Sequence, residues 1–142
     1  MTETAVDPVE HGVAVFGEMH PPARTEAFRM AANLTVPGGR MRRLAAEFIF
    51  GRLWDDKRLD RRSRSLVTLG ALIAQRAGDE FGNHVRVALA NGVTRQEIEE
   101  AITHAAAYAG FPAAHAAMGV AVRIFAEANG GKSDGIPAGQ PF

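Results

Sequence analysis

Glycine and proline interrupt this chain at short intervals, and the spacing of these breaks constrains the fold more than any other feature. Between the breaks, apolar residues recur at helical spacing, and no segment shows the strict alternation of a half-buried strand. The breaks fall at Pro21-Pro22, Pro37-Gly38-Gly39, Gly78, Asn91-Gly92, Gly110, Pro112 and Asn129-Gly130-Gly131. The sequence therefore predicts an all-α fold, a single-domain bundle of about six or seven helices over residues 1–142.

Helix-start and helix-stop signals give the expected bounds. Asp7-Pro8 is typical of a helix start, and Thr94-Arg95-Gln96-Glu97 of a capping box. Asp60 and Asp79 are expected to cap two further helices. The expected helices span residues 7–19, 23–33, 41–54, 60–77, 79–91, 94–109 and 112–128. Residues 1–6 and 130–142 are expected to be mobile.

Two apolar patterns indicate where the core lies. Residues 66–74 are apolar nearly all round, so this segment is expected to be the buried central helix. A second stripe over residues 41–54 consists of Leu44, Phe48 and Leu53, widened by Ala45 and Ile49. The aromatic side chains of Phe48, Trp54 and Phe111 are expected to belong to the core.

Composition excludes several classes of function. The chain has no cysteine, which rules out disulfides, thiolate metal sites and thiol redox chemistry. No apolar run approaches the roughly 20 residues that span a bilayer, and the N-terminus shows no secretory signal. We therefore expect a cytoplasmic protein that does not enter a membrane. The formal net charge of zero argues against a general nucleic-acid binder.

Basic residues are nevertheless concentrated in one region. Residues 40–64 hold nine of the sixteen lysines and arginines and only four acidic residues. Three of these arginines, Arg61, Arg62 and Arg64, open a predicted helix, where the helix dipole disfavours cations. A solvated face explains such a cluster, and so does an anion site or a charged subunit interface.

The best candidate for chemistry is a glutamate–histidine pair. Glu80 and His84 lie four residues apart on a predicted helix, so they share one face. Histidine is the side chain best suited to move protons near neutral pH, and Glu80 can orient it or supply its proton. The alternative is a histidine at the edge of the core, with Glu80 stabilising the first helical turn.

The other histidines are weaker candidates. His104 shares a predicted helical stripe with Tyr108 and could point into the same interior, or it could be a satisfied buried histidine. No histidine spacing matches a zinc motif, so no metal is expected. A glycine-rich phosphate loop is also lacking, and no cofactor is expected.

Three motifs, taken together, resemble the carboxymuconolactone decarboxylase family. They are LDRRSRSL at residues 59–66, HVRVALANGVT at residues 84–94 and YAGFPAA at residues 108–114. The resemblance covers about residues 10–128. It implies an all-helical fold shared with alkyl hydroperoxidase D-type proteins, and a homo-oligomer, a trimer or a hexamer. The peroxidases use two cysteines, which would fall on Ala77 and Glu80 here, so this chain resembles the cysteine-free decarboxylase branch.

The resemblance implies a reaction and a set of site residues. A cofactor-free lyase of this type would release CO2 from a small carboxylated lactone or a related enolisable acid. His84 would donate the proton, Glu80 would assist it, and His104 would stabilise the oxyanion. Arg61 or Arg64 would hold a substrate carboxylate. Arg52 stands where the decarboxylases typically carry glutamate, and Tyr108 belongs to the third motif, so both are expected near the substrate.

Two alternatives remain open at the level of sequence. The same acid–base pocket could serve a biosynthetic isomerase, cyclase or lyase with a larger apolar substrate, and Arg52 in place of glutamate leaves room for this. The chain could also be a non-catalytic oligomer that binds a small molecule. In each case we expect a small-molecule partner, no nucleic acid and no membrane.

Overall fold

The computed structural model describes residues 5–130, and this part of the chain contains helices but no strand. The elements are α1 (Pro8–Gly17), α2 (Pro22–Ala31), α3 (Gly39–Leu44), the π-helix η1 (Ala45–Trp54), α4 (Arg61–Ala74), α5 (Gly78–Ala90), α6 (Arg95–Ala109) and α7 (Phe111–Ala128). The predicted all-α fold is confirmed. The segments expected to be mobile lie outside the described residues, except for Ala5, Val6 and Gly130.

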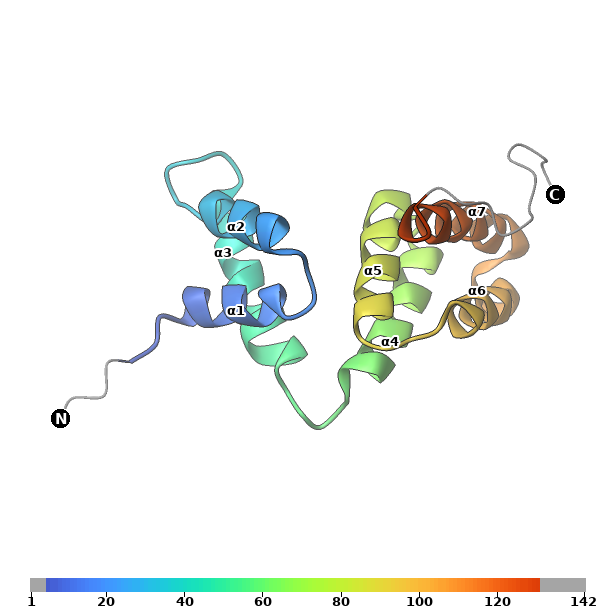
Figure 1. Ribbon diagram of the computed structural model, residues 1–142, viewed down its shortest axis with the longest axis horizontal. Coiled ribbons are helices and arrows are strands. Elements are labelled where there is room, and N and C mark those ends of the chain that lie inside the picture. The colour runs from blue at the N-terminus through green and yellow to red at the C-terminus, as the bar shows by residue number, and fades with distance from the viewer. Residues whose placement is uncertain (1–4, 131–142) are drawn as a thin grey trace. The chain divides into compact units, whose positions relative to one another are not determined.

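The chain divides into two compact units between Arg61 and Arg62. The first unit contains α1, α2, α3 and η1, and the second contains α4 to α7 (Figure 1). The expected single domain over residues 1–142 stays a prediction. Every helix within residues 5–130 is too short or too polar to span a bilayer.

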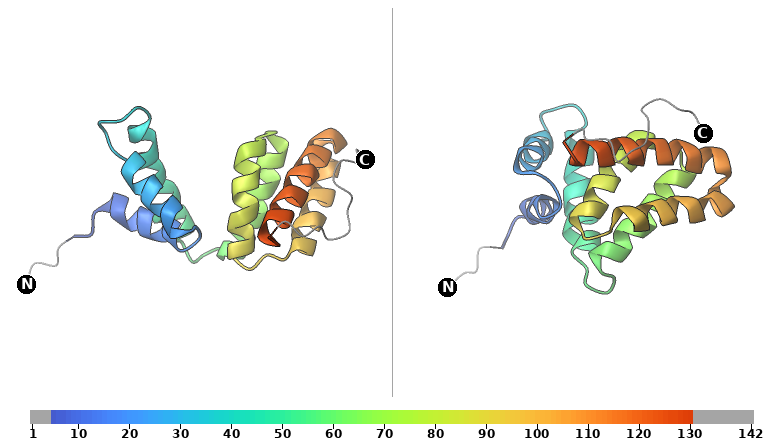
Figure 2. Two further views of the ribbon diagram at one scale, coloured as in Figure 1. Left: turned by 45° about the horizontal axis from the view of Figure 1, so that its top comes forward. Right: turned by 45° about the vertical axis from the view of Figure 1, so that its right-hand side comes forward.

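The first unit is organised by the crossing of α1 over η1 (Figure 2). A Cβ atom placed on Gly12 would lie 1.8 Å from the carbonyl oxygen of Ala46, so the two backbones are in direct contact there. Val9 and Val13 of α1 are buried with Ala46. Beside this crossing, the ring of Phe16 stacks on Phe28 at a centroid distance of 4.4 Å. Glycine at position 12 is therefore required by packing.

The segment expected as one regular α-helix over residues 41–54 is instead split into α3 and η1. Its stripe of large apolar residues does not face the core, because Leu44, Phe48 and Leu53 are 52%, 55% and 44% exposed. The small residue Ala46 occupies the buried side, since only a small side chain permits the backbone contact with Gly12. The i→i+5 bonding of a π-helix also changes which residues share a face. Predicting this stripe as core was wrong.

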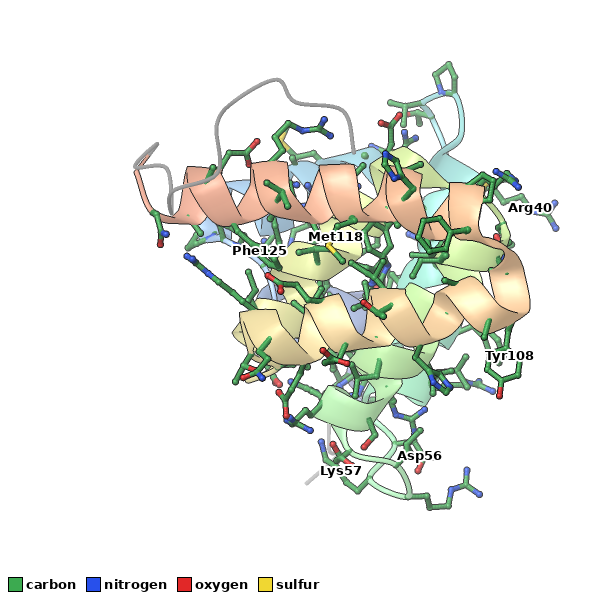
Figure 3. All side chains as sticks on the ribbon, turned by 90° about the vertical axis from the view of Figure 1, so that its right-hand side faces the viewer. Arg40, Asp56, Lys57, Tyr108, Met118 and Phe125 are labelled. Atoms are coloured by element: carbon green, nitrogen blue, oxygen red, sulfur yellow. The ribbon has the colours of Figure 1, made fainter. Side chains whose placement is uncertain are left out.

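The second unit has one continuous core drawn from all four of its helices. Its fully buried members include Leu69 from α4, Phe81 and Val85 from α5, and Ile98 and Ile102 from α6. Helix α7 adds mainly small residues, together with Phe125. Met118 and Phe125 lie between α6 and α7 (Figure 3). Small side chains on α7 let the neighbouring helices approach closely, which places the site-bearing helices α5 and α6 around it.

Three expectations for the second unit need correction. The segment 66–74 is not buried all round, because Val67 is 66% exposed and only Leu69 and Ile73 are fully buried, while Leu66 and Leu72 are partly buried against the core. Phe111 is 74% exposed, although Trp54 in the first unit is buried as expected. Helix α5 begins at Gly78, with Ala77 rather than Asp79 at the N-cap. A helix at the edge of a four-helix core buries one face only, whatever the hydropathy of the other.

The predicted helix starts at Asp7 and Thr94 are confirmed. A carboxylate oxygen of Asp7 accepts the backbone N–H of Val9 at 2.9 Å. Thr94 and Glu97 form the full capping box, in which each side chain accepts the other residue's backbone N–H. These local signals are readable because the cap and its partner lie within three residues of each other.

We expect Gly12→Ala to destabilise the first unit by about 1–3 kcal/mol, because the added methyl group overlaps the Ala46 carbonyl and the helices must move apart. Urea unfolding followed by far-UV circular dichroism measures this change. The matched control is Gly119→Ala on α7, where a Cβ meets nothing within 4 Å. The control should be neutral or stabilising by about 0.5–1 kcal/mol. Equal stability of the Gly12→Ala variant and the wild type would contradict the close helix contact.

Candidate functional site

The structure distributes the predicted site residues over both units. Arg52 and Arg61 belong to the first unit, whereas Arg64, Glu80, His84, His104 and Tyr108 belong to the second. Of these residues, His104 and Tyr108 lie close together on α6, and their ring centroids are 5.2 Å apart. No group of three or more acidic or histidine side chains within residues 5–130 is arranged to hold a metal ion.

His84 lies on the inner side of α5. It is half-buried, its Nδ1 atom is fully buried, and its neighbours Phe81, Val85 and Ala88 on the same face are buried core residues. Glu80, one turn earlier, is exposed, and its side chain makes no hydrogen bond or ion pair with the rest of residues 5–130. The i, i+4 spacing is therefore present, but the two side chains are not hydrogen-bonded in this conformation.

The predicted arginines have different surroundings. The guanidinium of Arg61 forms an ion pair with Glu18 at 2.5 Å, and its Nε donates to the backbone oxygen of Trp54 at 3.4 Å. Arg64, on α4 of the second unit, is half-buried. Arg52 is exposed on η1 and has no ion pair among the described residues. The charge of Arg61 is therefore already balanced, and Arg64 lies in the same unit as His84.

An open groove of about 820 Å³ lies between α4 and α6 of the second unit. Leu66, Val67, Gly70 and Ala74 form the α4 side, and the α6 side runs from Gln96 to Ala109. Neither Glu80 nor His84 lines this groove. It was not predicted, because the apolar segment 66–74 indicates a buried helix when it is read without its neighbours.

A row of polar side chains follows the α6 wall of the groove. Gln96, Glu100, His104 and Tyr108 recur at every fourth residue, so they form one line along the helix. Glu100 and His104 repeat the spacing of Glu80 and His84. Glu100 was not predicted as a site residue, although this second glutamate–histidine spacing could have revealed it.

A second, smaller cavity of about 90 Å³ lies among α4, α5 and α7. It is lined by apolar residues such as Phe81, Ala113 and Ala117, with Arg76 at its edge. Ala77, Gly78 and Phe81 on its wall come from the start of α5, the same part of the helix that carries Glu80. This cavity is too small for most organic ligands, whose pockets begin at roughly 300 Å³.

Glu97, at the end of the groove, has a lowered pKa. Its carboxylate accepts the backbone N–H of Thr94 at 2.8 Å and forms an ion pair with Arg62. The backbone donor of Thr94 and, next, the guanidinium of Arg62 hold the pKa of Glu97 below its ordinary value. Because these partners stabilise the ionised form, Glu97 has a structural role in starting α6.

Within residues 5–130 the chain is all-helical, with a glutamate–histidine spacing on α5 and an arginine-rich start of α4, and its sequence has no cysteine. The model of the carboxymuconolactone decarboxylase family matches residues 40–123, well over half of the chain. The chain is a member of the carboxymuconolactone decarboxylase family.

Curated relatives agree with this assignment. A nitrosuccinic acid decarboxylase of Metarhizium robertsii is 47% identical over 92 residues, which cover 65% of this chain and 62% of the relative. A 4-carboxymuconolactone decarboxylase of Acinetobacter baylyi is 37% identical over 111 residues, which cover 78% of each chain. An uncharacterized 15.0 kDa protein of Paracoccus denitrificans is 37% identical over 83 residues, 57% of this chain and 62% of the relative. This chain therefore spans less than two thirds of the first and third of these relatives.

We expect stability to fall as acid protonates Glu97. Its lowered pKa in the folded state means that its contribution is present above the ordinary carboxyl range and is lost as the pH falls through the folded-state pKa. Thermal unfolding between about pH 7 and pH 3 should show a shallower acid decline for Glu97→Gln than for the wild type. Glu99→Gln is the control, since the Glu99 side chain makes no hydrogen bond or ion pair in the described region. Parallel acid declines in Glu97→Gln and wild type would contradict the assignment.

Proposed function

We propose that this protein is a carboxy-lyase that removes CO2 from a small organic acid by acid–base chemistry. The observation that carries the proposal is the half-buried His84, with one ring nitrogen withdrawn from solvent, one helical turn after Glu80 in the segment that matches the family. Two relatives that carry decarboxylase names support the same class of reaction.

The names of these relatives also suggest a common chemistry for the substrate. Nitrosuccinic acid and carboxymuconolactone are both carboxylated compounds with an electron-withdrawing group, a nitro group in one and a lactone in the other. When the carboxylate leaves as CO2, its electron pair must pass into such a group. We therefore propose that the substrate is a small acid in which a nitro, lactone or similar carbonyl group can accept that pair.

Each proposed residue has one task in this reaction. The imidazolium of His84 donates the proton that replaces CO2 on carbon, and exposed Glu80 exchanges protons with water and returns one to His84. The half-buried Arg64 binds a carboxylate of the substrate. Arg61 is the second candidate for this binding, and its guanidinium forms an ion pair with Glu18. Partial exclusion of water at His84 strengthens its interaction with a developing negative charge.

The proposed reaction requires no added group. Proton transfer and charge stabilisation are enough when the substrate carries its own electron acceptor, so we propose a cofactor-independent enzyme. A thiol peroxidase mechanism is excluded by the absence of cysteine from the sequence. A cytoplasmic location and the absence of nucleic-acid and membrane partners stay part of the proposal.

We also propose that the protein assembles as a homo-oligomer, a trimer or a hexamer. Large apolar side chains such as Met41, Phe48, Val67, Tyr108 and Phe111 are 55–82% exposed. Exposed apolar groups on this scale are typical of protein–protein interfaces.

The prediction for His84 concerns turnover. His84→Gln should lower kcat/KM for decarboxylation by about 10²–10⁴-fold, because the general acid is lost while the polarity of the side chain is retained. CO2 release from 4-carboxymuconolactone and from nitrosuccinic acid provides the assay. Circular dichroism and thermal unfolding establish that the variant is folded. A folded His84→Gln variant with wild-type turnover on an accepted substrate would remove His84 from the mechanism.

A second prediction separates the two glutamate–histidine pairs. Glu80→Gln should lower kcat and change the pH dependence of kcat, because the proton supply to His84 is impaired. Glu100→Gln conserves shape on α6 and should leave kcat within about twofold if the chemistry belongs to the α5 pair. His104→Gln tests the proposed oxyanion role and should lower kcat by less than His84→Gln. If the two α6 variants lower kcat more than the two α5 variants do, the proton donor belongs to the α6 pair.

A further inference from the structure

Two complementary surfaces suggest how copies of this chain associate. We propose that the outer face of α3 and η1 from one copy occupies the α4–α6 groove of a second copy. Leu44, Phe48, Ile49 and Leu53 define this outer face. The inference rests on the self-association proposed above and adds to it a specific pair of surfaces.

Both surfaces expose apolar groups that a soluble monomer would leave in water. Ile49 and Leu53 of the outer face are 41% and 44% exposed, and the two other members of this face are more than half exposed. The groove has an apolar floor, and Val67 on its α4 side is 66% exposed. A helix with one apolar face is the occupant that a groove between two helices fits best.

Charge complementarity favours the same pairing. Arg40 comes before the apolar residues of this face in the sequence, and Arg52 lies among them, directly before Leu53. Both arginines are exposed and make no ion pair within residues 5–130. The groove, in turn, is lined by Glu97 and Glu100 but by no lysine or arginine. Glu97 is already paired with Arg62, whereas Glu100 has no cationic partner in the described region.

The two surfaces also match in length. The helical segment from Gly39 to Trp54 contains sixteen residues, and the groove follows α6 for fourteen residues, from Gln96 to Ala109. The contact joins different surfaces of the two copies, so it repeats head to tail and closes into a ring if the rotation permits. It would also place Arg52 of a second copy beside the α6 row that contains Glu100 and His104, and would withdraw His104 from water.

The natural absence of cysteine permits a direct test by cross-linking. Ile49→Cys on the outer face and Val67→Cys in the groove each introduce one thiol of similar size to the side chain replaced. A tagged Ile49→Cys protein and an untagged Val67→Cys protein are mixed, unfolded and refolded together, and treated with a short bismaleimide. We expect a covalent dimer that contains one copy of each, seen by denaturing electrophoresis and mass spectrometry.

The control and the alternative occupants give distinct results. Arg123→Cys, exposed on α7 and outside the groove, should give much less adduct with Ile49→Cys. A chain carrying both Ile49→Cys and Val67→Cys is refolded with an excess of wild type. An adduct that survives this dilution would show that the groove is filled by its own chain and would overturn the proposal. An oligomer that forms no Ile49–Val67 adduct would overturn this interface but leave self-association intact.

Charge reversal provides an independent readout. Glu100→Arg should weaken association by about tenfold or more in sedimentation velocity, because it places a cation opposite Arg52. Combination with Arg52→Glu should restore much of the loss. Glu99→Arg, one residue away and outside the groove, should have little effect. A Glu100→Arg variant that associates as tightly as wild type would overturn the assignment. Turnover is measured separately, and a monomeric wild-type protein that releases CO2 would refute the assembly while leaving the proposed reaction.

Discussion

Close approach of helices at small residues is the constraint on which both units depend. Residues 5–130 form helices and no strand, so each core is built by packing helices against one another, and small side chains set how near the helices come. In the first unit the contact between Gly12 and the Ala46 carbonyl brings α1 onto η1. In the second, the alanine-rich face of α7 receives α5, and Gly82 lies against Val120. Bulky side chains at these positions would separate the helices and open the core.

This constraint has a consequence for the surface. Because η1 turns Ala46 toward α1, the bulky apolar residues Leu44 of α3 and Phe48 and Leu53 of η1 are left exposed. Helix α4 shows the same division, because Leu69 and Ile73 enter the core while Val67 faces the groove. Each unit therefore packs its own core but leaves one apolar face exposed. The proposed contact between copies would cover both of these faces.

Local signals made much of the fold predictable, and the failures have a common physical origin. The cap at Asp7, the Thr94–Glu97 box and the glycine and proline breaks act within one helical turn, so the sequence alone reveals them. Phe48 and Phe111 were predicted as core because hydropathy records how apolar a residue is and not which face its helix presents. The spacing of Glu80 and His84 was predictable, but the exposure of Glu80 was not. Site geometry depends on tertiary packing that no local pattern encodes.

The two glutamate–histidine pairs share one spacing but lie in different environments. On α5, His84 shares a helix face with buried Phe81 and Val85, and its Nδ1 atom is shielded from water. On α6, His104 and Tyr108 border an open groove and remain solvated. A proton donor that must stabilise developing charge acts more strongly where water is excluded. The α5 pair meets that requirement in part within one unit, whereas the α6 pair would meet it only when another helix fills the groove. The proposed reaction therefore relies on His84, whereas the proposed contact between copies would cover His104.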